Sequence, residues 1–254
     1  MDLPVNAFKR RLAAGEQQIG LWSHLSSYIS TEVIAGAGFD WIVLDAEHSP
    51  NDPLTILPQL QACAEGTAAP VVRVPWNDTA LIKRYLDIGA QTLLVPYVQN
   101  AEEARSAVEA MRYPPRGMRG FTGLSRASRF GRVKNYFARA EQELCLIVQV
   151  ETGEALGNLE AIAGVDGVDA IFIGPGDLSA SLGYLGDPGN PEMQKIIIDT
   201  IKRIRACGKP AGILTADETL ARLYMQSGTT FTAVGADIAL LARGAEALAA
   251  RYKT

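Results

Sequence analysis

Acidic side chains follow two short apolar segments in the second half of the sequence. Glu151 comes after Leu-Ile-Val-Gln-Val at 146–150, and Asp177 comes after Ile-Phe-Ile-Gly-Pro-Gly at 171–176. Carboxylates suit hard octahedral ions such as Mg²⁺ and Mn²⁺, and two protein ligands would leave positions open for a bidentate 2-oxo acid. The alternative is that each acid caps the helix after it, which for Asp177 alone is an equal choice. The pair on neighbouring segments favours a metal site.

A histidine and an arginine occupy comparable positions. His48 follows an apolar run that ends at Asp45, and an imidazole can exchange a proton near neutral pH. A lone histidine is more often structural, but its place beside Asp45 and Glu47 favours catalysis. Arg73 lies within Val-Val-Arg-Val. A buried guanidinium needs an anion, either a structural carboxylate or a ligand oxygen, and we favour the ligand.

The elements that must position these residues repeat evenly along the chain. Strand-like apolar runs occupy 19–22, 41–45, 70–74, 92–96, 144–150, 169–173, 210–214 and 230–234. Predicted helices occupy 30–37, 53–64, 79–86, 101–112, 153–163, 191–206, 217–226 and 237–251, with Ser30 and Asp78 as N-caps of the first and third. The runs are too apolar for a wet face, so they predict buried parallel strands in about eight βα units.

This repeat favours an α/β fold, a (β/α)8 TIM barrel formed as a single domain over 1–254. A doubly wound open sheet is the competitor. Two features count against it, because no Gly-rich dinucleotide turn follows the first run and no composition break marks a second domain. The length of 254 residues also matches the size typical of such a barrel.

In a TIM barrel the carboxy-terminal ends of all strands share one rim, where the chemistry occurs. His48, Arg73, Gln149, Glu151 and Asp177 should therefore meet there. Leu214, which ends the seventh run, is expected at the same rim in contact with substrate. His24 ends the first run without an evident partner. Gly174-Pro175-Gly176 gives a loop whose N–H groups could meet a ligand carboxylate, although the same residues form ordinary turns.

The lysines supply a negative argument. None of them follows a predicted strand, and Lys209 precedes the seventh run, at the wrong end. A Schiff-base mechanism needs a desolvated lysine at the reacting centre, so its absence assigns enolate stabilisation to a metal. Five arginines crowd the irregular segment 113–134: Arg116, Arg119, Arg126, Arg129 and Arg132. A solvated basic loop is favoured over a lid that contacts a second substrate carboxylate.

Net charge, cysteine content and the length of the apolar runs limit the binding partners and the cellular compartment that we expect. A net charge of −4 gives no electrostatic case for nucleic acid or membrane. Cys63, Cys145 and Cys207 are far apart, so a disulfide framework is not expected. No run reaches the length of a signal peptide core or a membrane span. We therefore expect a soluble cytoplasmic protein that acts on small molecules.

Five motifs in order resemble the HpcH/HpaI aldolase family over essentially the whole chain. They are DWIVLDAEHSPN at 40–51, VVRVPWND at 71–78, RYPPRGMRG at 112–120, VQVET at 148–152 and IFIGPGDLS at 171–179. The resemblance implies a barrel of the phosphoenolpyruvate/pyruvate type. It also implies Mg²⁺, Mn²⁺ or Co²⁺ held by Glu151 and Asp177, and pyruvate contacted by Gln149 and the backbone of Gly176 and Asp177, with alanine common in the family at the position of Gly176.

The resemblance also implies roles for the remaining site residues. His48 matches the family's catalytic base and Arg73 its transition-state arginine. Asp87, in Leu-Asp-Ile-Gly-Ala, matches an aspartate that raises the basicity of the histidine and can come from a neighbouring subunit. Sequence reasoning alone places Asp87 on the surface. The implied assembly is a hexamer, a trimer of dimers, with the last helix exchanged between protomers.

The implied reaction is a reversible class II aldol cleavage, in the family's catabolism of aromatic compounds. A 4-hydroxy-2-oxo acid, best matched by 4-hydroxy-2-oxoheptanedioate, would give pyruvate and succinate semialdehyde. An alternative is an aldolase for sugar-derived acids, such as 2-keto-3-deoxy-rhamnonate or 2-dehydro-3-deoxyglucarate. A subunit that cleaves CoA thioesters and a non-catalytic barrel that binds a 2-oxo acid are less favoured.

Overall fold

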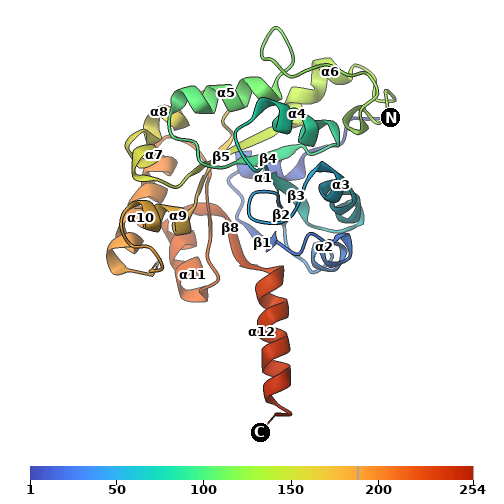
Figure 1. Ribbon diagram of the computed structural model, residues 1–254. Helices are drawn as coiled ribbons and strands as arrows, with labels where there is room; N and C mark the ends of the chain where they lie inside the picture. The colour runs from blue at the N-terminus through green and yellow to red at the C-terminus, as the bar shows by residue number, and fades with distance from the viewer. Residues whose placement is uncertain (188, 254) are drawn as a thin grey trace.

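Eight parallel strands pair in chain order and close into a barrel in the computed structural model, which describes residues 1–187 and 189–253 (Figure 1). The strands are β1 (Gln18–Ser23), β2 (Trp41–Asp45), β3 (Ala69–Arg73), β4 (Thr92–Val95), β5 (Cys145–Val150), β6 (Ala170–Ile173), β7 (Ala211–Leu214) and β8 (Thr229–Ala236). β1 pairs with both β2 and β8, which closes the sheet. The predicted (β/α)8 barrel is confirmed.

Helices surround the barrel and alternate with the strands. They are α1 (Ala7–Ala13), α2 (Tyr28–Ala35), α3 (Pro53–Ala62), α4 (Thr79–Asp87), α5 (Ala101–Met111), α6 (Tyr136–Arg139), α7 (Gly153–Gly157), α8 (Leu159–Ala163), α9 (Pro175–Ser181), α10 (Pro191–Ala206), α11 (Glu218–Ser227) and α12 (Asp237–Ala250). Short 3₁₀ turns occur at η1 (Cys63–Glu65), η2 (Arg126–Ser128) and η3 (Ala140–Glu143).

The helix boundaries confirm one predicted cap and correct another. Asp78 caps α4 by accepting a hydrogen bond from the Leu81 N–H at 2.8 Å. Ser30 was the wrong cap for α2, because Ser27 accepts from the Ser30 N–H and the helix begins earlier. The predicted helix 153–163 is divided at Asn158 into α7 and α8. The helices α1, α6 and α9 were not predicted.

Alternation along each strand divides the core into two layers. Trp41, Val43 and Val71 belong to the cluster inside the barrel, whereas Ile42 and Leu44 pack in the layer under the helices. The inner layer needs glycine where large rings cross it. A Cβ at Gly212 would lie 2.2 Å from the Phe231 ring, and one at Gly20 would lie 2.3 Å from the Trp41 ring.

The helix α1 closes the barrel at the amino-terminal ends of the strands. Phe8 and Leu12 are buried in the inner cluster, and the Phe8 ring lies 5.6 Å from that of Trp41. Asn6 starts the helix by accepting from the Lys9 N–H. Its backbone N–H also donates to the Glu143 carboxylate at 2.7 Å. This end of the barrel is therefore sealed, which leaves the other end open for a site.

The last helix, α12, projects away from the barrel (Figure 1). Asp237 at its start is buried, but its apolar residues Ile238, Leu240, Leu241 and Leu248 are exposed. Isolated apolar helices of this length gain their stability from packing against a partner. None of the helices in the described part of the chain is long and apolar enough to cross a membrane.

Candidate active site

Strand alternation aims a set of polar side chains into the open mouth of the barrel. On β2 the inward positions are Trp41, Val43 and Asp45, and on β3 Val71 is followed two residues later by Arg73. Successive side chains of a strand point to opposite faces. Asp45 and Arg73 are therefore the last inward residues of their strands, above the apolar layer.

Arg73 is held by carboxylates of its own chain. Its Nε and Nη2 donate to the two oxygens of Asp45 at 2.8 and 2.6 Å, and its Nη1 lies 2.9 Å from Glu47 Oε2. The guanidinium also lies 5.1 Å from the centre of the Trp22 ring. We favoured a ligand oxygen over a structural carboxylate as the anion beside Arg73. This preference was wrong, because Asp45 and Glu47 are structural carboxylates that pair with Arg73. A role of Arg73 toward a ligand stays a prediction.

The pairing with Arg73 sets the charge of Asp45. Burial opposes ionisation of this fully buried carboxyl group, but the hydrogen bonds and charge of Arg73 outweigh burial and lower the pKa of Asp45. The Glu47 and His48 N–H groups also donate to Asp45 Oδ1, at 3.0 and 3.4 Å. Asp45 therefore fixes both the guanidinium and the turn that carries His48.

Glu151 continues the inward face of β5. It is 1% exposed and accepts hydrogen bonds from the Tyr97 N–H at 2.8 Å and from Gln149 Nε2 at 2.5 Å. Burial is the main reason why the pKa of Glu151 is raised, to about 7. Tyr97 adopts a left-handed backbone, φ 58°, to direct its N–H at this carboxylate. A Cβ at Gly174 would lie 2.4 Å from Glu151 Oε2, so only glycine leaves room for this carboxylate.

Asp177 lies on the next loop, in the first turn of α9, and is exposed. The alternative that each acid caps the helix after it is wrong for both Glu151 and Asp177 in the described residues. Gly174 is the N-cap of α9 without a side-chain hydrogen bond, and Thr152 caps α7. The charges of Glu47 and Asp177 both raise the pKa of Glu151, after burial. The structure therefore brings three carboxylates within electrostatic range of one another.

The acids at the mouth fit a divalent cation. Glu151 has no ion pair within the described residues, and the buried Gln149 Oε1 beside it has no hydrogen-bond partner there. Burial first, and then the charges of Asp45 and Asp177, also keep the pKa of Glu47 raised at about 7 although Arg73 opposes this. In residues 1–187 and 189–253 no three His, Cys, Asp or Glu side chains form a metal cage. Glu151 and Asp177 would thus hold an ion as a pair, with other positions open.

Both histidines lie at this mouth. His48 is exposed, with a side-chain accessibility of 57%, and its Nε2 is 3.8 Å from Glu47 Oε2. His24, for which the sequence showed no partner, has two, because its Nδ1 lies 3.0 Å from Ser49 Oγ and 3.2 Å from Asp45 Oδ2. Burial, more than the nearby charges, lowers the pKa of His24. The exposed His48 is thus the imidazole available to a substrate.

The structure also shows where the remaining predicted residues lie. Leu214 ends β7 partly buried against the inner cluster, and Gly176 is exposed with open space where a Cβ would be, so the family's alanine would fit there. Asp87 does not reach the mouth of its own barrel. It ends α4, which runs back toward the amino-terminal ends of the strands, and it accepts from Arg119 Nη2 at 2.8 Å. No lysine occupies the carboxy-terminal end of any strand in the described residues.

Sequence reasoning gave no role to Asp237 or Tyr97. Asp237, at the start of α12, accepts from the His24 N–H at 2.8 Å and from Ser23 Oγ at 3.2 Å, and so fixes the end of β1. Tyr97 acts through its backbone N–H. A backbone donor leaves no signature in sequence, although an acid at the start of a final helix is a detectable signal.

A closed parallel barrel, with one sealed end and an acidic mouth at the carboxy-terminal ends of its strands, defines a TIM-barrel enzyme. Comparison with known proteins identifies the family to which this enzyme belongs. A family model described as HpcH/HpaI aldolase/citrate lyase matches residues 18–244. The chain belongs to this family.

Proteins that are similar over nearly the full length of the chain support the same family. A protein of Rhizobium etli named pyruvate aldolase is 63% identical over 254 residues, covering 100% of both chains. A protein of Salmonella heidelberg named 4-hydroxy-2-oxo-heptane-1,7-dioate aldolase is 56% identical, covering 97% of this chain and 94% of the relative. A crystal structure of a family member from Burkholderia cenocepacia superimposes with a TM-score of 0.94 at 37% identity, covering 98% of this chain and 100% of that one. The chain is accordingly a carbon–carbon lyase.

Proposed function

We propose that the chain is a divalent-metal-dependent aldolase that cleaves 4-hydroxy-2-oxo acids to pyruvate and an aldehyde, with 4-hydroxy-2-oxoheptanedioate as the best candidate substrate. The observation that carries this proposal is the buried carboxylate of Glu151, which has no ion pair within the described residues and lies within electrostatic range of Asp177 and Glu47. The names of the two similar proteins, pyruvate aldolase and 4-hydroxy-2-oxo-heptane-1,7-dioate aldolase, support the same substrate class.

Glu151 and Asp177 would hold Mg²⁺, Mn²⁺ or Co²⁺. When bound, the ion supplies a Lewis acid for the charge that develops on the keto oxygen. Gln149 Oε1 and Nε2 and the backbone of Gly176 and Asp177 orient the pyruvate half of the substrate. The imidazole of His48 removes the proton of the C4 hydroxyl, because it is exposed and has no short contact to a carboxylate.

As the C4–O bond becomes a carbonyl, the C3–C4 bond breaks and its electron pair moves toward C3 and the keto oxygen. Arg73 would donate to that oxygen, while Asp45 and Glu47 hold its fork in place. Preorganised donors of this kind usually give the largest electrostatic part of catalysis. A proton then returns to C3, which gives pyruvate, and the aldehyde leaves. For the best candidate the aldehyde is succinate semialdehyde.

The deciding experiment measures pyruvate release from a panel of 4-hydroxy-2-oxo acids. The panel contains 4-hydroxy-2-oxoheptanedioate and, for the sugar-acid alternative, 2-keto-3-deoxy-rhamnonate and 2-dehydro-3-deoxyglucarate. EDTA should abolish release, and Mn²⁺ or Mg²⁺ should restore it. Activity that persists in EDTA would refute the metal, and saturable pyruvate binding without turnover of any member would support the non-catalytic alternative.

We also propose that the chain assembles as a homo-oligomer, a hexamer built from dimers, in which α12 packs on a second copy. The exposed apolar side chains of α12 need a partner surface, and the helix projects from its own barrel (Figure 1). Asp87 lies away from the mouth of its own barrel, so it would act on His48 of a second copy. His48→Ala and Asp87→Ala should each be nearly inactive. Mixing the two after dissociation should restore activity, since some hybrid sites are intact. If mixtures stay inactive, Asp87 does not act across an interface.

A further inference from the structure

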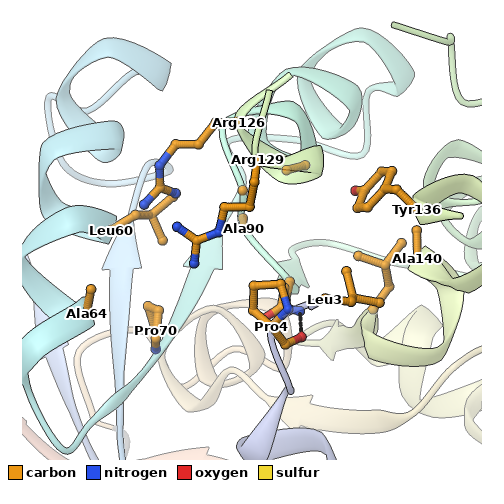
Figure 2. A pocket seen from close by; sticks show the side chains of 14 residues that line it. Leu3, Pro4, Leu60, Ala64, Pro70, Ala90, Arg126, Arg129, Tyr136 and Ala140 are labelled. Atoms are coloured by element: carbon orange, nitrogen blue, oxygen red, sulfur yellow. Dashed lines mark hydrogen bonds between the residues drawn. The ribbon is translucent and has the colours of Figure 1, made fainter. Parts of the chain in front are cut away.

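A cavity with two arginines lies at the opposite end of the barrel from the mouth. Its volume is about 150 Å³, and Pro70 at the start of β3 and Gln91 just before β4 line it. Figure 2 shows the side chains of Arg126 and Arg129 directed at this cavity, with Pro4 and Tyr136 across from them. Because active sites of such barrels occupy the other end, this cavity is separate from the mouth of its own barrel.

The charge of the cavity is uncompensated. Among the residues that line it are two arginines, and none is an aspartate or glutamate. Arg116 and Arg119 of the same segment are paired with Glu141 and Asp87. Within the described part of the chain, neither Arg126 nor Arg129 has an ion pair.

The guanidinium groups of Arg126 and Arg129 carry like charges and repel each other. Arg126 Nη1 donates to the Ile88 carbonyl at 2.8 Å, which leaves its other donors without a carboxylate. Burial, and then the charge of Arg129, lowers the pKa of Arg126. On the other side of the arginines a groove of about 610 Å³ includes Asp87, but that carboxylate is already paired with Arg119. A bound anion would relieve this repulsion.

The backbone holds Arg129 in place. Arg129, Phe130 and Gly131 adopt consecutive left-handed conformations, with φ of 51°, 58° and 80°. Two of the three are not glycine, so the conformation is strained. Ser128 Oγ accepts from the Gly131 N–H at 3.0 Å and stabilises the turn. Strain of this kind persists where the surroundings fix it, frequently at ligand clamps.

We propose that Arg126 and Arg129 form a binding site for a small divalent oxyanion, inorganic phosphate or a short dicarboxylate, at this cavity. The planar forks of two arginines match the paired oxygens of such an anion. The small volume and the absence of an acidic side chain from its lining favour a small, fully charged ligand.

Isothermal titration calorimetry tests this site, with sodium phosphate and sodium succinate as probes against sodium chloride at equal ionic strength. Arg129→Asn removes one guanidinium, and asparagine tolerates the left-handed backbone. Arg132→Asn is the matched control. It loses the same charge from the same segment, but its guanidinium lies over the Phe130 ring, at 5.9 Å, and does not line the cavity.

Wild type and Arg132→Asn should bind one of the two probes saturably with similar affinity. Arg129→Asn should bind it roughly tenfold more weakly, as expected for a lost charge-assisted contact. Arg126→Lys keeps the charge without the fork and should also weaken binding. Pyruvate added to occupy the barrel mouth should not change the titration. The proposal is overturned if neither probe binds, if pyruvate abolishes binding, or if Arg132→Asn loses as much affinity as Arg129→Asn. Because binding is measured without turnover, the outcome is independent of the aldolase assay.

Discussion

Replacing Glu151 by glutamine should make the metal-free protein more stable while it removes the proposed metal site. The carboxylate is buried at 1% exposure, and its neighbours Glu47 and Asp177 are also acidic. Burial raises the pKa of Glu151 from 4.5 to about 7. A carboxyl group whose pKa is higher in the folded state destabilises folding as the pH rises, because the unfolded chain ionises more easily.

The magnitude follows from that pKa. Above pH 7 the ionised Glu151 costs about 3 kcal/mol of folding free energy, and at pH 5.5 it costs about 1 kcal/mol. Glutamine should relieve this cost at little expense in hydrogen bonds. The Tyr97 N–H still finds an amide oxygen, and Gln149 can turn its unpaired Oε1 toward the new amide.

Urea denaturation of the EDTA-treated proteins measures the effect. Glu151→Gln should exceed wild type by up to about 3 kcal/mol at pH 8.5 and by about 1 kcal/mol at pH 5.5. Mn²⁺ should stabilise wild type and leave the variant unchanged. The exposed Glu218, which pairs with Arg222 on α11, supplies the control Glu218→Gln, with a change below about 1 kcal/mol at both pH values. A variant less stable than wild type at pH 8.5 would refute the account of Glu151 as an uncompensated buried charge.

Two further substitutions test the parts of the barrel that support the site. Asp45→Asn should lower the free energy of unfolding measured in urea by about 3 kcal/mol, because Arg73 loses its fully buried partner and only Glu47 remains. The same substitution should slow pyruvate release. An unchanged free energy of unfolding would show that Glu47 alone compensates Arg73. Phe8→Ala should cost about 3–5 kcal/mol by opening the sealed end of the barrel. Phe121→Ala, at a phenylalanine that is 71% exposed, should change stability by less than about 0.5 kcal/mol.

Apolar periodicity was sufficient to predict the barrel. Each of the eight predicted strands overlaps an observed one, because buried parallel strands are continuous apolar runs that few other elements resemble. The helices were less predictable. Ser27 and Ser30 are both good N-caps, and only the structure shows which hydroxyl meets the free N–H groups. The α1 helix has one short apolar pair, Phe8 and Leu12, and its stability depends on the barrel beneath it.

The candidate site was predictable in its residue types but not in its pairings. The ends of the runs identified His48, Arg73 and Glu151 as residues of one rim, because a barrel collects the ends of its strands. The partner of Arg73 was not predictable. Asp45 lies 28 residues earlier in the chain, and the choice between a protein carboxylate and a ligand depends on side-chain direction. The role of Asp87 was not predictable for a different reason. Within its own chain Asp87 pairs with Arg119, so any role at an active site requires a second chain.

The two ends of the barrel carry opposite uncompensated charge, and the core explains why both can persist. The mouth has an excess of carboxylates over Arg73, whereas the cavity at the other end has Arg126 and Arg129 without an acid. The interior of the barrel holds a layer of aromatic rings, in which the centres of the Trp22 and Phe172 rings lie 5.4 Å apart and those of Trp41 and Phe231 lie 5.7 Å apart. These rings fill the interior of the barrel, so the charged side chains at its two ends do not meet through it. We therefore expect each end to take its counter-charge from solution or from a second chain, the proposed cation at the mouth and the proposed anion at the cavity.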